Sequence, residues 1–379
     1  MEPVRHGSYL EVDLGLLKSN VELLRKSYDK NEILFMVKAD AYGHGLISIV
    51  DFAFRECGIK EFGVATLNEA LYLRDQLPEF TGEIYVFSEL GLSFRDHREV
   101  YLHKRIIPVI ARWPDLEAYL EDERTRSQLP LCLKFNTGMN RLGIPYDEVD
   151  KVIEKLNLYQ KKSLFHLLTH FANGSLSMHK NNRNIWQRER FAEIKEAFKK
   201  ANIILERTSL SNSAAIEQGI GKEETHIRPG LLLYGPSSLA PNIRSQSQWN
   251  GKVISSLKTY ILHSFEVKKG DPLSYGSTPA PEDGVVAILA VGYGDGVSTA
   301  YQGTKLHYKG KVGKVCGRVC MDMTTVLFPV GTQLDQGDEF LIWSHEQEDI
   351  ESISRQTKTL AYELVIQLTP RVSRIYRLN

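Results

Sequence analysis

The sequence predicts an α/β protein with an N-terminal TIM-type (β/α)₈ barrel and a C-terminal, mainly antiparallel β domain. Short apolar runs alternate with amphipathic helical segments along the first part of the chain, up to Gly235. A turn-rich stretch, PSSLAPNIRSQSQWNG, follows, and beyond it short runs of alternating character are separated by glycines. We therefore expect the barrel in residues 1–240 and the β domain in residues 241–379.

Short apolar runs predict the strands of the barrel. Amphipathic periodicity predicts helices between most of these runs, most clearly at Leu16–Tyr28, Leu67–Gln76, Asp147–Tyr159 and Arg183–Ala201. The alternation fits a closed barrel of ~250 residues, although an open doubly wound sheet would show the same alternation. The expected strands are Ile33–Val37, Phe62–Ala65, Ile84–Phe87, Ile106–Ile110, Leu131–Phe135, Leu164–Thr169, Arg207–Leu210 and Leu231–Tyr234.

A second set of short runs predicts the strands of the C-terminal domain. Glycines and turn residues separate these runs, and helical patterns are sparse between them, which is typical of an antiparallel sheet. The expected strands are Ser255–Val267, Val285–Val291, Lys305–Tyr308, Lys311–Cys316, Thr324–Phe328 and Glu339–Trp343.

Composition excludes several classes of protein. The 379 residues are 42% apolar and 25% charged, as in ordinary globular proteins, so a wholly disordered or collagen-like chain is excluded. Lys plus Arg and Asp plus Glu both number 47, so the net charge of zero gives no general attraction to nucleic acid or to anionic membranes. The longest apolar run, Val285–Val291, is far shorter than the ~20 residues that span a bilayer, and no secretory leader is visible. Four scattered cysteines favour neither a disulfide framework nor a metal site, and we expect a cytoplasmic protein without a metal.

The motif MVKADAYGHG places a lone lysine, Lys38, at the end of the first expected barrel strand. In a barrel the carboxyl ends of the strands surround the active site. Apolar walls there would lower the pKa of the lysine and make its amine a nucleophile for a carbonyl group. A lysine that extends its amine to solvent from a strand end fits the motif equally well.

Polar clusters also follow four later strands. KFNTGMNRLGI contains Lys134, THFANGS contains His170, SLSNSAA begins at Ser209, and HIRPGLLLYG contains Arg228 and Gly230. Small polar residues and glycines after the last two strands of a barrel typically bind phosphate. A reactive lysine beside a phosphate site indicates a phosphorylated aldehyde, and pyridoxal phosphate is the leading candidate. An aldolase that binds a phosphorylated sugar through its lysine fits these residues nearly as well.

Taken together with LSYGS, VGYGDG and GRVCMD in the second half, these motifs resemble those of alanine racemase in order and spacing. The resemblance covers nearly the whole chain. It implies a fold-type III pyridoxal-phosphate enzyme, an isomerase that interconverts L-alanine and D-alanine and supplies D-alanine for peptidoglycan. It also implies that the protein forms a homodimer and binds a small amino-acid substrate. Neither nucleic acid nor a membrane is an expected partner.

The resemblance also assigns roles to individual residues. Lys38 matches the lysine that forms the Schiff base with pyridoxal phosphate, and Arg228 matches the arginine that faces the pyridine nitrogen. His170 would pack beside the cofactor ring. The phosphate group would be bound by Tyr42, Ser213, Tyr362 and the backbone amides of Gly230 and Leu231.

Catalysis would use two bases on opposite faces of the substrate. The resemblance implies that Lys38 acts on the D side and that Tyr275, supplied by the partner subunit, acts on the L side. Arg141 and the backbone amide of Met321 would bind the substrate carboxylate. The remaining assignments are Lys134, a position often carbamylated in this family that then orients Arg141, and Tyr293 at the entrance.

Several positions depart from the family pattern. Ser209 stands where many members have a histidine that supports the pyridine-facing arginine, which puts the support of Arg228 in doubt. Ser175 and Thr299 replace an acidic residue and an arginine that are common at the entrance, and Met323 ends an MDM motif where MDQ is more usual. These changes keep open a racemase of broader amino-acid range. A non-catalytic pyridoxal-phosphate carrier is the third possibility, although such carriers usually lack the C-terminal β domain.

Overall fold

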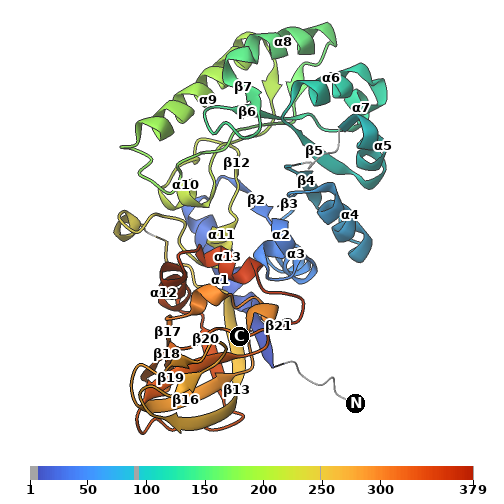
Figure 1. The fold of residues 1–379 in the computed structure, drawn as a ribbon. Coiled ribbons are helices and arrows are strands. Elements are labelled where there is room, and N and C mark those ends of the chain that lie inside the picture. The colour runs from blue at the N-terminus through green and yellow to red at the C-terminus, as the bar shows by residue number, and fades with distance from the viewer. Residues whose placement is uncertain (1–6, 89–93, 248, 379) are drawn as a thin grey trace.

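The computed structural model describes residues 7–88, 94–247 and 249–378. It contains a parallel barrel and a separate, mainly antiparallel sheet, which lie end to end (Figure 1). One continuous hydrophobic core extends from the barrel, at residues such as Phe62 and Leu133, into the sheet, at residues such as Val326 and Phe340. Among the described residues, no helix has the length and apolar character that crossing a membrane requires.

The barrel is nearly closed, and its strands lie in the order β11-β9-β6-β5-β4-β3-β2-β12. Neighbouring strands are parallel. No ladder joins β11 to β12 in the described chain, but Arg228 N donates to Ser211 O at 3.3 Å across this seam. The strand bounds are β2 (Glu32–Met36), β3 (Glu61–Val64), β4 (Glu83–Val86), β5 (Ile106–Ile110), β6 (Cys132–Asn136), β9 (His166–Leu168), β11 (Thr208–Ser209) and β12 (His226–Ile227), with β7 (Ile144–Pro145) beside β6 and β8 (Ser163–Leu164) beside β10 (Ile204–Leu205).

The prediction of a strand at Leu231–Tyr234 is wrong, because these residues form the short helix α11 (Leu231–Tyr234). The eighth barrel strand is β12 instead, which precedes it. All four residues of α11 are buried, and an apolar run of this length has no period that separates a buried strand from a buried helix.

Helices surround the barrel where the amphipathic pattern predicts them. Helix α1 begins because Asp13 Oδ1 accepts a hydrogen bond of 3.0 Å from Leu16 N, and it reaches the end of the barrel through Asn20 Nδ2, which donates to Leu233 O at 3.0 Å. The helices are α1 (Leu14–Ser27), α2 (Lys38–Tyr42), α3 (Leu46–Arg55), α4 (Leu67–Gln76), α5 (Phe94–Lys104), α6 (Trp113–Glu121), α7 (Glu123–Gln128), α8 (Val149–Leu158), α9 (Asn182–Lys200) and α10 (Ser213–Glu217), followed by α11.

The second sheet has the strand order β17-β18-β19-β16-β13-β1-β21, and β20 also pairs with β13. All of its pairs are antiparallel except β1 with β21. Strand β1 precedes the barrel along the chain yet lies in this sheet, so the first and last strands join the two parts of the molecule. The elements are β1 (Ser8–Asp13), β13 (Ser255–Val267), β14 (Pro272–Leu273), β15 (Thr278–Pro279), β16 (Gly284–Leu289), β17 (Lys305–Tyr308), β18 (Lys311–Val315), β19 (Thr324–Pro329), β20 (Glu339–Trp343), α12 (Gln347–Thr357), α13 (Ala361–Ile366) and β21 (Ser373–Arg377).

Candidate active site

Lys38 follows strand β2 at the carboxyl end of the barrel and begins an unusual turn. The next four residues, Ala39, Asp40, Ala41 and Tyr42, have φ angles of 52°, 55°, 53° and 55°, which is the left-handed region. Non-glycine residues seldom adopt this conformation, and a run of them costs roughly 1–2 kcal/mol for each residue. Strain of this kind persists only where the surrounding structure holds it, and it is typical of functional sites.

Two carboxylates stabilise this turn, one from helix α4 and one from the turn itself. Glu69 Oε1 accepts a hydrogen bond of 2.7 Å from Ala39 N, while Glu69 Oε2 accepts from Ala65 N at 2.8 Å. Asp40 Oδ1 accepts from Leu46 N at 2.7 Å. Glu69 also completes the capping box of α4, which a T-x-x-E pattern in the sequence could have revealed.

The last strand of the chain holds the turn from the other side. Arg374 Nε donates to Gly43 O at 3.1 Å, and Tyr376 Oη donates to His44 O at 3.0 Å. His44 is itself buried, stacked on the Tyr234 ring, with its Nε2 3.1 Å from Ser255 Oγ. No local sequence signal identifies Arg374 and Tyr376 as supports, because they lie more than 300 residues from the turn.

The barrel strands bring several cations together. Burial lowers the pKa of Lys38, the positive charge of Arg141 lowers it further, and Glu69 partly opposes both effects. Burial, followed by Arg141, Arg228 and Lys38, lowers the pKa of Lys134 to about 8. Cations that lower one another's pKa in this way favour the binding of an anion.

Arg228 and His170 lie deeper in the same group. Burial lowers the pKa of Arg228 to about 10, and burial together with Arg228 holds the pKa of His170 well below its usual value. Arg228 Nη1 donates to Ser209 Oγ at 2.5 Å, and its Nη2 donates to Thr169 O. The His170 Nδ1 atom lies 3.5 Å from Arg228 Nη2.

Ser213 is the centre of a cluster of hydroxyl and amide groups. Its Oγ accepts hydrogen bonds from Gly230 N at 2.9 Å and Leu232 N at 3.3 Å. The assignment of the Leu231 backbone amide to the phosphate group stays a prediction, since the hydrogen bond from Leu232 N to Ser213 Oγ does not involve it. The Tyr42 hydroxyl lies so close to Gly230 that a Cβ atom on this glycine would collide with it.

Tyr42 and Tyr362 complete this cluster. Their rings meet edge to face with centroids 6.3 Å apart, because α13 packs against α2. Burial raises the pKa of both tyrosines, so their hydroxyl groups stay neutral hydrogen-bond donors.

These residues fit pyridoxal phosphate on chemical grounds. The hydroxyl groups of Tyr42 and Ser213 and nearby amides are donors for a phosphate group. Lys38 offers an amine to the aldehyde, and Arg228 offers N–H donors to an unprotonated pyridine nitrogen. The strained turn places Lys38 and Tyr42 on the same short segment, so one feature of the fold orients both.

Helix α9 ties together the loops that carry Arg141 and His170. Gln187 Nε2 donates to Thr137 Oγ1 at 3.1 Å and to His170 O at 3.0 Å. The Arg190 guanidinium lies between the rings of Tyr146 and Trp186 and donates to Thr137 O at 3.0 Å. Neither Gln187 nor Arg190 has a sequence signal beyond the helical pattern.

The other three residues expected from the C-terminal domain, Tyr275, Tyr293 and Met321, lie on loops that neighbour one another. Tyr293 N donates to Cys320 O at 3.0 Å and Gly294 N to Met321 O at 2.8 Å, so the Tyr293 and Met321 loops are neighbours. Ser274 Oγ donates to Arg318 O at 2.7 Å, which brings the loop of Tyr275 to the same place. The exposed fractions of the Tyr275, Met321 and Tyr293 side chains are 72%, 53% and 46%. Two entrance positions of the family pattern, Ser175 and Thr299, are exposed.

The chain matches two family models in the order of its domains. Residues 12–238 match the alanine racemase N-terminal domain, and residues 254–376 match the alanine racemase C-terminal domain. Among curated relatives, the alanine racemase of Photobacterium profundum is 31% identical over 375 residues, which is 97% of this chain and 98% of that protein. The alanine racemase of Haemophilus influenzae is 30% identical over 359 residues, or 94% of each chain.

Solved structures of alanine racemases also resemble this protein. The enzyme from Acinetobacter baumannii has a TM-score of 0.84 at 27% identity, covering 99% of this chain and 100% of that chain. The enzyme from Bacillus anthracis with bound L-Ala-P has a TM-score of 0.86 at 26% identity, covering 100% of this chain and 96% of that chain. With the sequence matches, this agreement across both domains shows that the chain belongs to the alanine racemase family of pyridoxal-phosphate-dependent isomerases.

Proposed function

We propose that the chain racemises alanine by two-base proton transfer at Cα, with Lys38 of one subunit and Tyr275 of a second subunit as the bases. The observation that carries this proposal is the position of Lys38. It lies on a strained turn, among the cations Arg141, Lys134 and Arg228, and beside the hydroxyl groups that suit a phosphate. When bound, pyridoxal phosphate withdraws electrons from the substrate and makes the Cα proton acidic.

Lys38 has two tasks in this mechanism. Its amine would hold the cofactor in the absence of substrate, and with substrate bound it would remove or return the Cα proton on the D side. A base must be unprotonated, and burial together with Arg141 lowers the pKa of Lys38 towards the range where its amine is neutral. Glu69 fixes the amide of the next residue and therefore the direction of Lys38.

Tyr275 supplies the base for the L side. Removal and return of a proton with inversion requires a second group on the opposite face of the substrate. Tyr275 is 72% exposed on the β domain, and Tyr293, Met321 and Met323 beside it are 46%, 53% and 43% exposed. Large apolar side chains exposed together favour an interface, and a homodimer would carry this group to the barrel of the second copy.

Other side chains bind and orient. The Arg141 guanidinium and the backbone amide of Met321 would bind the substrate carboxylate. Carbamylation of Lys134 needs a neutral amine, and a pKa of about 8 makes this form accessible near neutral pH. Arg228 would donate to the pyridine nitrogen and keep it unprotonated, which limits electron withdrawal and disfavours transamination and decarboxylation.

The relatives, which are alanine racemases, support alanine as the substrate. Supply of D-alanine for peptidoglycan is part of the proposal. The alanine racemase of Bartonella henselae, which shares this fold with a TM-score of 0.85 at 24% identity over 98% of this chain and 99% of that one, holds covalently bound pyridoxal phosphate. The exposed Ser175 and Thr299 keep a broader amino-acid range as the second candidate.

Proton exchange tests this function. Protein loaded with pyridoxal phosphate is given L-alanine in D₂O, and the Cα proton is followed by NMR with chiral analysis of the product. We expect loss of the Cα proton together with accumulation of D-alanine. Cofactor binding without exchange or inversion of alanine would contradict the proposal, and exchange of other amino acids would then favour the broader racemase over the carrier.

A further inference from the structure

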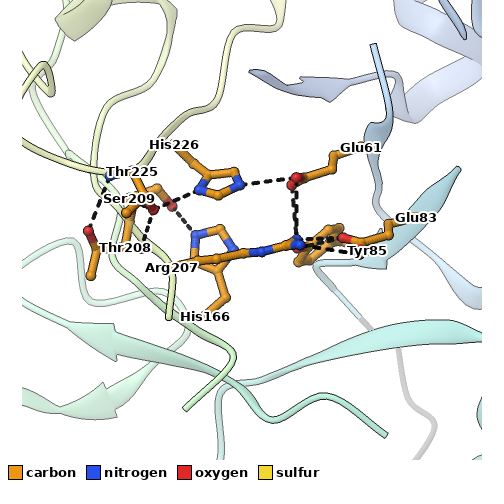
Figure 2. Close-up of polar contacts among 9 residues, drawn as sticks. All are labelled: Glu61, Glu83, Tyr85, His166, Arg207, Thr208, Ser209, Thr225 and His226. Atoms are coloured by element: carbon orange, nitrogen blue, oxygen red, sulfur yellow. Dashed lines mark hydrogen bonds and ion pairs between the residues drawn. The ribbon is translucent and has the colours of Figure 1, made fainter. Parts of the chain in front are cut away.

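Ser209 stands where the family pattern has a histidine, yet it supports Arg228 directly. Arg228 Nη1 donates to Ser209 Oγ at 2.5 Å, and Ser209 Oγ lies 2.8 Å from His166 Nε2. Figure 2 shows the hydrogen bond between the Ser209 hydroxyl and the imidazole of His166. The exposed fractions of His166, Ser209 and Arg228 are 0%, 0% and 3%, so water does not substitute for these bonds.

The directions of these hydrogen bonds follow from the donors available. A guanidinium only donates, so Ser209 Oγ accepts from Arg228. The Ser209 O–H then points to His166 Nε2, which must be unprotonated, and the proton of the neutral imidazole lies on Nδ1. Burial, assisted by the charges of His226, Arg228 and Arg207, holds the pKa of His166 well below its usual value, which agrees with a neutral ring.

The opposite tautomer satisfies fewer groups. If His166 Nε2 carried the proton, Ser209 Oγ would accept from both neighbours and its own O–H would have no acceptor. His166 Nδ1 has no hydrogen-bond partner among the described residues in either case. An unsatisfied buried donor costs ~1–3 kcal/mol, so the arrangement with fewer unsatisfied groups is favoured.

The barrel architecture explains how a histidine on one strand serves an arginine on another. Strands β9 and β11 are parallel neighbours, with Ser209 opposite Leu168. His166 lies two residues before Leu168, on the same side of β9, and therefore below Ser209 inside the barrel. Arg228 follows β12, on the other side of the seam that no ladder closes in the described part of the barrel.

The ring of His166 is held from two directions. The Tyr85 ring meets it edge to face with centroids 5.7 Å apart, and the His226 ring lies 5.0 Å away. His226 Nε2 is in turn 3.0 Å from Glu61 Oε1, and Arg207 Nη1 donates to Tyr85 Oη at 2.7 Å (Figure 2). This network of side chains inside the barrel fixes the imidazole in place.

We propose that His166 and Ser209 form a positioning pair that orients the Arg228 guanidinium towards the pyridine nitrogen of the cofactor. The histidine accepts the serine proton, which leaves the serine oxygen free to accept from Arg228 and strengthens it as an acceptor. The inference rests on the proposed function, because the pyridine nitrogen belongs to the bound cofactor. Both residues would act through Arg228, because Ser209 contacts its guanidinium and His166 contacts Ser209.

The test compares Ser209→Ala with Ser211→Ala in the full-length protein loaded with pyridoxal phosphate. Ser211 is also fully buried, but its Oγ has no hydrogen-bond partner in the described structure, so its removal is a matched control. The first readout is the ¹⁵N NMR signal of His166 in histidine-labelled protein, and the second is the dissociation constant of the cofactor. Racemase activity is a third readout.

We expect wild type to show an unprotonated, hydrogen-bonded His166 Nε2. Ser209→Ala should move this signal to that of a nitrogen without a hydrogen bond and raise the dissociation constant about tenfold, the effect of one lost charge-assisted hydrogen bond. Ser211→Ala should change neither. His166→Leu should raise the dissociation constant as Ser209→Ala does, and His166→Gln, whose amide oxygen can replace Nε2 as acceptor, should restore it at least in part.

A protonated Nε2 in wild type, or equal effects of Ser209→Ala and Ser211→Ala on the dissociation constant, would overturn the inference. If His166→Leu does not fold, the two serine variants still decide. Wild-type protein that binds the cofactor without racemising alanine would contradict the proposed function instead, and the ¹⁵N signal and the dissociation constant would still decide on the positioning pair.

Discussion

The backbone amide of Ala39 donates a hydrogen bond of 2.7 Å to Glu69 Oε1, so a residue of helix α4 holds the turn that carries Lys38. The same carboxylate caps α4 through Ala65 N and Thr66 N. One side chain therefore joins the start of a helix to the left-handed turn beside it. The position of Lys38, the proposed base, depends on this contact, because the turn conformation is unfavourable by itself.

Replacing Glu69 with alanine should therefore reduce both stability and catalysis. Loss of the cap and of the bond to Ala39 should lower the free energy of unfolding by about 1–3 kcal/mol. A displaced Lys38 should lower kcat by about tenfold to a hundredfold. Urea unfolding and steady-state kinetics measure the two effects, with the exposed surface residue Glu121 changed to glutamine as the control. Unchanged kcat in Glu69→Ala would show that Glu69 is not needed to position Lys38.

The carboxyl-terminal strand should stabilise the same turn. Tyr376→Phe removes the donor to His44 O and should lower the free energy of unfolding by about 1 kcal/mol. Arg374→Met should cost about 2–4 kcal/mol, because Arg374 also donates to Leu368 O, Thr369 O and Val372 O. Chemical denaturation measures both variants. An Arg374→Met protein as stable as wild type would contradict this role of β21.

Stability should fall as the pH drops from 6.5 towards 4. Burial lowers the pKa of His44 from 6.5 to about 4, so His44 is neutral in the folded protein where the unfolded chain binds a proton. Acid therefore favours the unfolded state. The contribution of His44 to the free energy of unfolding, up to about 3 kcal/mol, is present above pH 6.5 and is lost by pH 4. His166 and His170, whose pKa values are also lowered, act in the same direction.

Denaturation curves across this pH range test the sign and the source of the effect. His44→Asn should flatten the dependence, whereas replacing the exposed His103 with glutamine should leave it as in wild type. A wild-type protein whose stability rises between pH 6.5 and 4 would contradict the buried, neutral state of these imidazoles.

Tyr275→Phe should abolish racemisation while the cofactor remains bound. Loss of a general base typically costs about 10²–10⁴ in rate, and Tyr275 is too exposed for its hydroxyl to support the fold. The expected result is a normal absorption spectrum of bound pyridoxal phosphate with little exchange at Cα. Tyr72→Phe, another exposed tyrosine, is the control and should keep full activity. Full activity in Tyr275→Phe would remove Tyr275 from the mechanism.

Much of the fold is predictable because the spacing of apolar residues along the chain indicates which side of each helix or strand is buried. The structure confirms helix α4 and strands β5, β13, β17 and β20 at the residues that the sequence predicted. The failure at Leu231–Tyr234 has a clear cause, since four buried apolar residues carry no period. The pairing of β1 with β13 and β21 is equally invisible, because it joins strands from opposite ends of the chain.

The site shows a similar division. Lys38 and Arg228 follow barrel strands, where the barrel pattern indicates chemistry, whereas Tyr42 was assigned only through the family resemblance. The structure places Lys38 and Arg228 near Lys134, and Tyr42 against Gly230. The supports Glu69, Arg374 and the pair His166–Ser209 act across space between elements that the sequence separates. Ser209 illustrates the limit: the residue alone suggested a missing support, and the neighbouring strand supplies the imidazole.

Mixing two inactive variants tests the central claim, that each active site combines Lys38 of one subunit with Tyr275 of the other. Lys38→Ala and Tyr275→Phe proteins are co-expressed, so that mixed dimers form. Each mixed dimer then contains one site with both wild-type bases and one site with neither, and random assortment gives about a quarter of wild-type activity. Recovery of this activity is the predicted result, and a mixture as inactive as its parents would contradict the account.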